Sequence, residues 1–167
     1  KKIIKGFGLK FRPGIDLYAR LNGDLAPCRL RLTPEDILGL NGNRRISKNG
    51  CSHTLSTLDH STGNKLFHCA IGGGDGIYID PYGNTFPCSL IRKPLINLLK
   101  NGFNSALPKL RSLTKNKEFV TASNCNGCSL RESCHWCPGR AGLETGDIEA
   151  PIDYYCGLAR AQAKNYA

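Results

Sequence analysis

Four of the nine cysteines fall within thirteen residues, in the stretch NCNGCSLRESCHWCPGR at positions 124–140. They form two C-x2-C pairs, Cys125 with Cys128 and Cys134 with Cys137, and only five residues separate the pairs. A C-x2-C pair makes a tight loop whose two sulfurs converge on one metal ion or on one face of a metal cluster. The types and the spacing of these residues therefore predict a metal site.

Three kinds of chemistry could use so many thiols. A secreted disulfide scaffold usually has an even number of cysteines and a signal sequence, and neither is seen here. Tetrahedral zinc binds thiolates at about 2.3 Å, but ribbon-type zinc sites place about 15–20 residues between their pairs. An iron–sulfur cube is larger than one ion, so separate segments can supply its ligands. That size would also give a purpose to Cys69, Cys88 and Cys156. It favours iron–sulfur chemistry, while zinc stays open.

The overall composition is that of an ordinary globular protein, with 40% hydrophobic and 22% charged residues. Its apolar runs are too short to span a bilayer and no signal peptide opens the chain, so we expect a cytoplasmic protein without membrane contact. The absence of methionine indicates a fragment of something longer.

The formal charge of +10 invites a nucleic-acid interpretation, but the cations are scattered, with no dense run beyond Arg44-Arg45. Two iron–sulfur cubes with eight thiolates would lower the net charge to about +6. We therefore do not expect nucleic acid as the partner, although a basic face could attract an acidic peptide or protein.

Local patterns predict an α+β fold of short elements. Thr33 suits a helix N-cap and Pro34 the first helical position. Residues 41–66 are predicted to form a long polar connection, and Cys51 is a candidate for fixing that connection to the rest of the fold. The expected elements are extended segments at 3–11 and 15–21, a helix at 34–40, hairpin strands at 76–80 and 84–88, helices at 91–102 and 105–116, and a last helix from about 151 that carries Cys156.

The longer cysteine series resembles a known signature. Cys69-x13-Gly83-x4-Cys88, then Cys125-x2-Cys128-x5-Cys134-x2-Cys137, then Cys156, is similar to the seven-cysteine pattern of the SPASM domain. This is the C-terminal auxiliary-cluster domain of many radical S-adenosylmethionine enzymes. The resemblance covers about residues 66–167, and one spacing departs, because two residues stand between Cys134 and Cys137 where the family more commonly has three.

The resemblance implies a domain organisation and a fold. Residues 1–45 would be the C-terminal remnant of a radical-SAM partial (β/α) barrel, and residues 46–66 a connection. Residues 67–167 would be the SPASM domain, a small hairpin and short helices around two [4Fe–4S] clusters.

The resemblance also implies two interleaved ligand sets. Cluster II would be held by Cys125, Cys128, Cys134 and Cys156, and cluster I by Cys69, Cys88 and Cys137. Family members often have a further cysteine shortly before the position of Cys69, where this chain reads STGNKLFH.

We expect Cys51 as the fourth ligand of cluster I. The alternatives are an iron left open for substrate, or ligation by His60 or His68. Cys28 has no assigned role and is expected to be an inert buried thiol.

Smaller features refine this interpretation. Trp136 is expected to pack over a cluster and limit its contact with solvent. The catalytic C-x3-C-x2-C motif and a GGE-like motif are missing, so this chain alone should not cleave S-adenosylmethionine, which only the full-length parent would bind. Ser89 follows Cys88 where the sulfatase-maturing branch has an Asp base, which argues against that chemistry.

The expected function is electron transfer and substrate positioning during peptide or protein modification, within a parent radical-SAM oxidoreductase or maturase. The expected partners are a peptide or protein substrate and a reductant such as a flavodoxin or ferredoxin. Two alternatives remain open: a zinc-binding interaction or nucleic-acid module, and a stand-alone iron–sulfur electron carrier.

Overall fold

The computed structural model describes residues 6–8, 16–41, 64–69, 71, 76–131 and 134–166. These residues form short helices and one small antiparallel sheet, as the α+β prediction required. In chain order the elements are the 3-10 helix η1 (Ala26–Leu30), α2 (Pro34–Asn41), β1 (Tyr78–Ile79), β2 (Asn84–Phe86), β3 (Ile96–Asn97), α4 (Leu98–Asn101), α5 (Phe103–Ser112), α6 (Pro138–Thr145) and α7 (Asp153–Tyr166).

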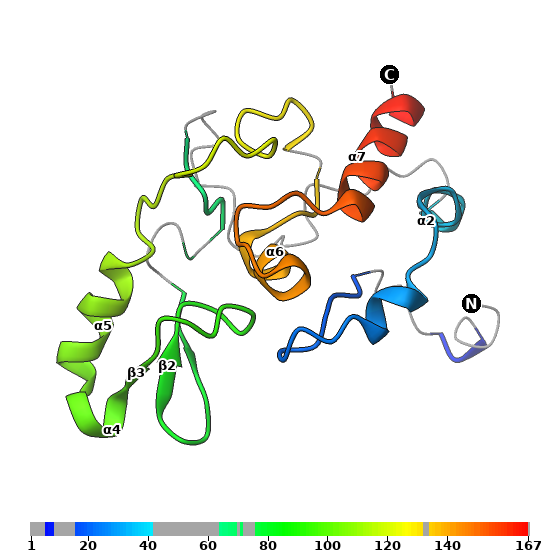
Figure 1. Ribbon diagram of the computed structural model, residues 1–167. Helices are drawn as coiled ribbons and strands as arrows, with labels where there is room; N and C mark the ends of the chain where they lie inside the picture. The colour runs from blue at the N-terminus through cyan, green and yellow to red at the C-terminus, as the bar shows by residue number, and fades with distance from the viewer. Residues whose placement is uncertain are drawn as a thin grey trace.

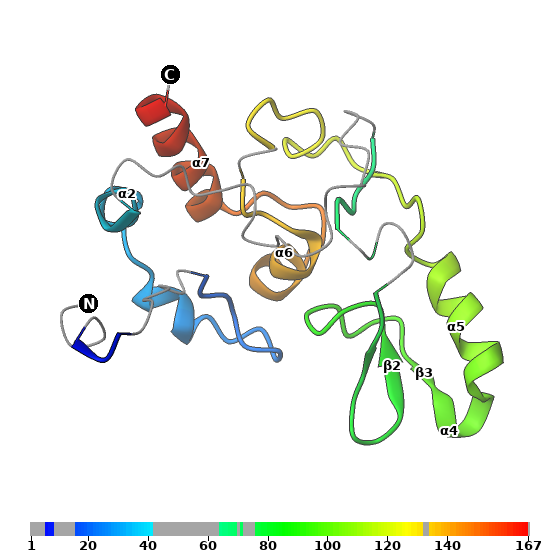
Figure 2. The ribbon, with the colours of Figure 1, turned by 180° about the vertical axis from the view of Figure 1, so that it is seen from behind.

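The elements are spread between two ends of the molecule. The sheet, α4 and α5 occupy one end, α2 and α7 the other, and α6 lies between them (Figures 1 and 2). Helices α2 and α7 pack against each other although more than a hundred residues separate them in the chain. In the described ranges, no helix has both the length and the apolar character needed to cross a membrane.

The N-terminal part confirms one predicted element and corrects another. The backbone N–H of Asp36 donates to Oγ1 of Thr33 at 3.1 Å, and Pro34 opens α2, so the predicted cap and helix are confirmed. The extended segment at 15–21 is wrong for its described residues, which are irregular and turn at Leu21-Asn22. The other extended segment, at 3–11, lies mostly outside the described residues, and the structure does not confirm a partial barrel.

The predicted hairpin is confirmed. Strands β1 and β2 pair antiparallel with Tyr78 opposite Phe86. The turn between them is held by the Asp80 carboxylate, whose Oδ1 accepts from the backbone N–H of Tyr82 at 2.9 Å and of Asn84 at 3.0 Å.

A third strand replaces the first half of the helix predicted at 91–102. Ile96 pairs with Thr85, so β3 extends the sheet, and helix α4 begins only at Leu98. Pro94 explains the difference, because proline disfavours helical backbone in the residue before it. Asn97 then caps α4 by accepting from the N–H of Lys100 at 3.1 Å. The helix predicted at 105–116 is observed as α5, displaced toward the N-terminus at Phe103–Ser112.

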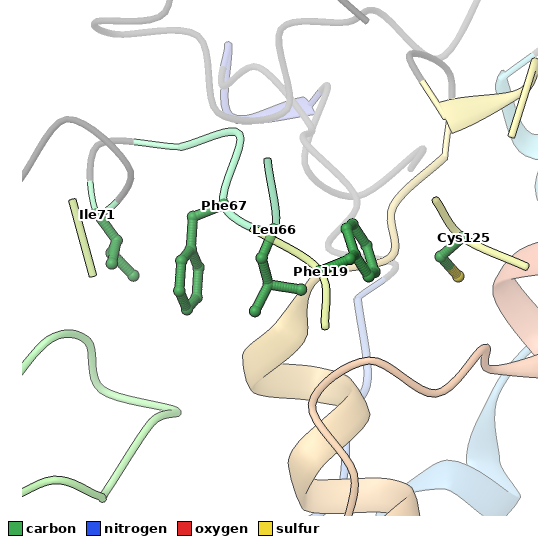
Figure 3. Packing of buried hydrophobic residues seen from close by; sticks show 5 residues of the cluster. All are labelled: Leu66, Phe67, Ile71, Phe119 and Cys125. Atoms are coloured by element: carbon green, nitrogen blue, oxygen red, sulfur yellow. The ribbon is translucent and has the colours of Figure 1, made fainter. Parts of the chain in front are cut away.

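Two small buried clusters make up the core near the cysteine stretch. The first consists of Leu66, Phe67, Ile71, Phe119 and Cys125 (Figure 3). The second consists of Ala141, Ile152 and Tyr155. Trp136 packs against both clusters and therefore joins them.

A short antiparallel pairing brings the segment before Cys69 beside the segment before the cysteine stretch. Lys65 bridges to Glu118, the N–H of Leu66 donates to the Lys117 oxygen at 2.8 Å, and the N–H of Phe119 donates to the Asn64 oxygen at 2.9 Å.

Candidate metal centre

The backbone of the cysteine stretch folds back on itself. At the first pair, Gly127 has φ +71°, a conformation that glycine adopts without steric cost, so the loop can turn tightly between Cys125 and Cys128. Further on, the N–H of Arg131 donates to the Cys128 oxygen at 3.0 Å, and the N–H of Cys134 donates to the Arg131 oxygen at 3.2 Å. These bonds return the second pair toward the first.

Helix α7 adds the fourth thiol. The Cys134 thiol donates to the backbone oxygen of Tyr155 with a sulfur–oxygen distance of 3.7 Å, and Cys156 is the next residue along the helix. Burial raises the pKa of the Cys134 thiol to about 11, and Cys156, Cys125 and Cys128 act in the same direction. Burial also raises the pKa of Cys125, followed in importance by Cys156. The other three residues predicted for cluster II thus lie close enough to Cys134 to contribute to its raised pKa.

Arg131 lies beside these thiols. Its guanidinium donates to the oxygens of Cys125 at 2.8 Å and Leu66 at 3.0 Å, and lies over the rings of Phe119 and Trp136, 4.8 and 4.9 Å from their centroids. Burial lowers the pKa of Arg131, and the charges of Cys125, Cys134 and Cys128 oppose that effect. Among the described residues, no carboxylate forms an ion pair with this guanidinium.

Glu149 connects the segment that precedes the first cysteine pair with the segment that precedes α7. Its carboxylate accepts from the N–H of Val120 at 3.0 Å and from the N–H and Oγ1 of Thr121 at 2.8 and 2.5 Å. Burial raises the pKa of the Glu149 carboxyl, but these hydrogen bonds and the charge of Lys117 outweigh it, so the pKa is lowered. Ser123 adds a hydrogen bond from its hydroxyl to the Glu149 backbone oxygen.

Trp136 packs beside Cys134 against the second buried cluster. It is partly buried and stacks on Phe119 with a centroid distance of 6.0 Å. Its Nε1 donates to the Ala150 oxygen at 2.8 Å, which fixes the indole to the residues leading into α7. Whether it covers a cluster remains a prediction.

Two residues predicted for cluster I meet at the start of α6. Cys137 caps this helix, its sulfur accepting from the N–H of Arg140 at 3.5 Å, while the N–H of Leu90 donates to the Cys88 sulfur at 3.2 Å. A Cβ at Gly139 would lie 2.8 Å from the Cβ of Leu90, so only glycine allows this approach. Burial raises the pKa of Cys137, and Cys88 contributes in the same direction.

The remaining cluster I candidates are placed less closely. Cys69 packs against the same core cluster as Cys88, formed around Leu66 and Phe119. Nε2 of His68 lies 2.9 Å from the Lys65 oxygen. Cys51 and His60 lie outside the described residues.

Cys28 differs from its prediction. It lies in η1, apart from both thiol groups, and is partly exposed rather than buried. Burial raises its pKa nonetheless, with smaller effects from Arg31 and Glu144.

An ionic network joins the N-terminal segment to α6 and α7. Arg31 forms a two-pronged pair with Glu144, at 2.9 and 2.5 Å, and both side chains are only 8% exposed. The same guanidinium lies 4.5 Å from the ring centroid of Tyr154. Asp16 pairs with both Arg140 and His135 at 3.3 Å, and the hydrogen bond from His135 is the main reason for its lowered pKa.

The donor set has the chemistry that a cluster bound by thiolates would require. Seven cysteines of the described residues are free thiols and so not committed to a disulfide: Cys28, Cys88, Cys125, Cys128, Cys134, Cys137 and Cys156. As the side chains stand, no group of three or more His, Cys, Asp or Glu among the described residues is arranged to hold a single metal ion. The fit therefore depends on soft sulfur donors gathered from several segments, with a cation beside them.

Comparison with known proteins gives no relative. The chain matches no family model, no curated protein and no solved structure at a significant level.

Sequence reasoning missed the residues that organise the site, above all Arg131, Glu149 and Gly139. Arg131 stands between the two C-x2-C pairs, and that position is a signal that could have singled it out. Glu149 has no comparable local signal, because its partners are almost thirty residues away.

Proposed function

We propose that this chain is an auxiliary iron–sulfur domain that binds two [4Fe–4S] clusters. Cys125, Cys128, Cys134 and Cys156 hold cluster II, and Cys69, Cys88 and Cys137 hold cluster I with a fourth ligand from Cys51. The observation that carries the proposal is that the Cys134 thiol lies against α7 one residue before Cys156, while the half-buried Arg131 side chain bonds the Cys125 backbone beside it. Thiolates bound to a metal cluster carry negative charge, which a nearby cation stabilises.

A bound [4Fe–4S] cluster supplies one-electron transfer. The chain's own residues fix the ligands and limit solvent access. Glu149 and Trp136 hold the entrance of α7 against the cysteine stretch, and Gly139 lets the Cys137 segment approach the Cys88 segment. The resemblance to SPASM domains supports a place in a radical-SAM parent that modifies a peptide or protein, in the cytoplasm, where S-adenosylmethionine binds elsewhere.

An uneven charge distribution supports an acidic partner. Residues 92–117, which include α4 and α5, contain seven cations and no acidic residue. They are Arg92, Lys93, Lys100, Lys109, Arg111, Lys115 and Lys117. Opposite charge speeds the encounter of proteins and orients them. We propose that an acidic reductant, of the flavodoxin or ferredoxin kind, approaches this side.

Zinc is the second candidate, because four cysteines are also the ligand set of many structural zinc sites, although the four thiols would have to draw together to hold a single ion. Anaerobic purification followed by iron, sulfide and zinc analysis separates the two. The iron–sulfur proposal predicts about eight iron and eight sulfide per chain, and visible absorption that dithionite bleaches. One or two zinc ions in a colourless protein that does not react with dithionite would refute it.

A further inference from the structure

We propose that Arg131 is the counter-cation of cluster II and that its positive charge raises the reduction potential of that cluster. The inference rests on the proposed function and goes beyond it, because it gives a non-ligand residue control over the electron affinity of one of two clusters.

The guanidinium of Arg131 is fixed in place from several sides. It donates to the oxygens of Cys125 and Leu66 at 2.8 and 3.0 Å, with a longer contact of 3.5 Å to the Lys65 oxygen. Its Cζ lies over the rings of Phe119 and Trp136, 4.8 and 4.9 Å from their centroids. A guanidinium group held by carbonyl oxygens and aromatic rings has little freedom to move into solvent.

The backbone of Arg131 is equally bound to the ligands. Its N–H reaches the Cys128 oxygen and its own oxygen accepts from the N–H of Cys134, at 3.0 and 3.2 Å. With the side-chain bond to Cys125, this residue therefore contacts three of the four cysteines assigned to cluster II. The fourth, Cys156, follows Tyr155, whose oxygen accepts from the Cys134 thiol.

Among the described residues, Arg131 has no carboxylate partner of the kind that comparable arginines have. Arg31 pairs with Glu144 at 2.5 Å, and Arg140 pairs with Asp16 at 3.3 Å. Both also lie over aromatic rings, as Arg131 does, but each of them has a carboxylate partner as well. In the described part of the chain, the guanidinium of Arg131 instead lies against backbone oxygens of the cysteine stretch and of Leu66, beside the cysteine side chains. A partly buried cation is costly unless an anion compensates it.

A cluster held by four thiolates is such an anion. The thiolates outweigh the positive charge of the oxidised core, and reduction by one electron adds a further negative charge without moving a proton. A fixed cation beside the cluster stabilises the reduced state more than the oxidised state. Cluster II should therefore accept an electron more readily than it would without Arg131.

The experiment compares Arg131→Gln, which removes the positive charge, with Arg131→Lys, which keeps the charge but loses the planar guanidinium group and its paired hydrogen bonds. Reduction potentials are measured by electron paramagnetic resonance during anaerobic titration with dithionite. They are measured in the intact chain and in a Cys137→Ser background expected to keep only cluster II. Arg20→Gln serves as the matched control, because Arg20 is exposed and paired with Asp24.

We expect the potential of cluster II to become more negative in Arg131→Gln and to stay near the original value in Arg131→Lys. The potential of cluster I should change much less, and Arg20→Gln should leave both unchanged. Thermal stability should fall in both Arg131 variants, since both lose hydrogen bonds and ring contacts. An unchanged potential in Arg131→Gln, or equal shifts in the two variants, would overturn the inference.

Loss of cluster II from a variant is also informative. If Arg131→Gln loses about half of the iron while Arg131→Lys keeps it, the charge is needed for assembly and the inference holds. If both lose it, Arg131 acts through packing and the inference fails. A wild-type chain without iron would instead refute the proposed function itself, and the inference with it.

Discussion

The thiol of Cys134 lies 3.7 Å from the backbone oxygen of Tyr155, so the cysteine stretch touches α7 one residue before Cys156. This contact bridges 21 positions of the chain. The arrangement of the cysteine stretch therefore depends on the position of α7.

Replacing Cys156 with serine should remove cluster II alone. Serine is a much poorer ligand to iron than a thiolate, so about half of the iron and sulfide, roughly four of each, should be lost. Metal analysis and the visible spectrum after anaerobic purification measure this. Cys28→Ser is the control, because Cys28 lies outside both thiol groups, and it should keep all the iron. Equal losses in the two variants would contradict the ligand assignment.

Gly139→Ala should weaken the junction of the Cys88 and Cys137 segments. The new methyl group would lie 2.8 Å from the Cβ of Leu90, which is close to the backbone and cannot rotate away. We expect a loss of about 1–3 kcal/mol in stability, visible as a lower melting temperature and faster loss of cluster I iron.

Gly39→Ala is the matched control for that substitution. Gly39 lies within α2 and nothing stands within 4 Å of its added Cβ, so alanine should raise stability by about 0.5–1 kcal/mol. A Gly139→Ala protein as stable as the parent would show that the two segments can separate without consequence.

Glu149→Gln should lower stability at neutral pH by about 1–3 kcal/mol, because a neutral amide replaces a carboxylate that accepts several hydrogen bonds. The folded-state pKa of Glu149 lies below its unfolded value. The carboxylate therefore stabilises the fold fully above the unfolded pKa of about 4.3, and this contribution disappears as the pH falls through the folded pKa.

Melting temperatures of Glu149→Gln and the parent should thus converge in acid and diverge toward neutral pH. Exposed Glu35 provides the control, since Glu35→Gln should change stability by at most about 0.5 kcal/mol. A constant difference between parent and Glu149→Gln across this pH range would mean that the carboxylate charge has no role.

Reversing charges on the cation-rich segment should slow reduction by an acidic flavodoxin. In Lys100→Glu with Lys109→Glu, stopped-flow rates at low ionic strength should fall several-fold and lose part of their salt dependence. Lys164→Glu, near the end of α7 and away from α4 and α5 in Figure 1, should have a smaller effect. The double variant makes two charge reversals and Lys164→Glu makes one, so a double variant that changes the logarithm of the rate only twice as much as Lys164→Glu would mean that only net charge matters.

What could be predicted from the sequence depended on short-range signals. Thr33 with Pro34, the turn around Gly83 and the helix carrying Cys156 were recognisable because their determinants lie within a few residues. Helix α6 has comparable signals, Cys137 as cap, Pro138 as first residue and Gly146 in left-handed conformation at its end, and it was not predicted.

The supporting structure of the site could not be predicted in this way. The local sequence around Ile96 predicts a helix. In the folded protein Ile96 instead pairs with Thr85 in the sheet, and a local pattern does not indicate that pairing. Arg131 reaches carbonyl oxygens 65 and 66 positions away, and Arg31 reaches Glu144 across 113 positions. Such contacts form only through tertiary packing, and local secondary-structure propensity does not predict them.

The Arg31–Glu144 pair has a consequence for how this protein can be divided. Excising residues 67–167 would delete the arginine and leave Glu144 facing Tyr155 without its guanidinium. The buried carboxylate would then lose the cation that compensates its charge, which should loosen α6. Moving residues 67–167 into another protein would therefore require residues 16–41 to be moved together with them.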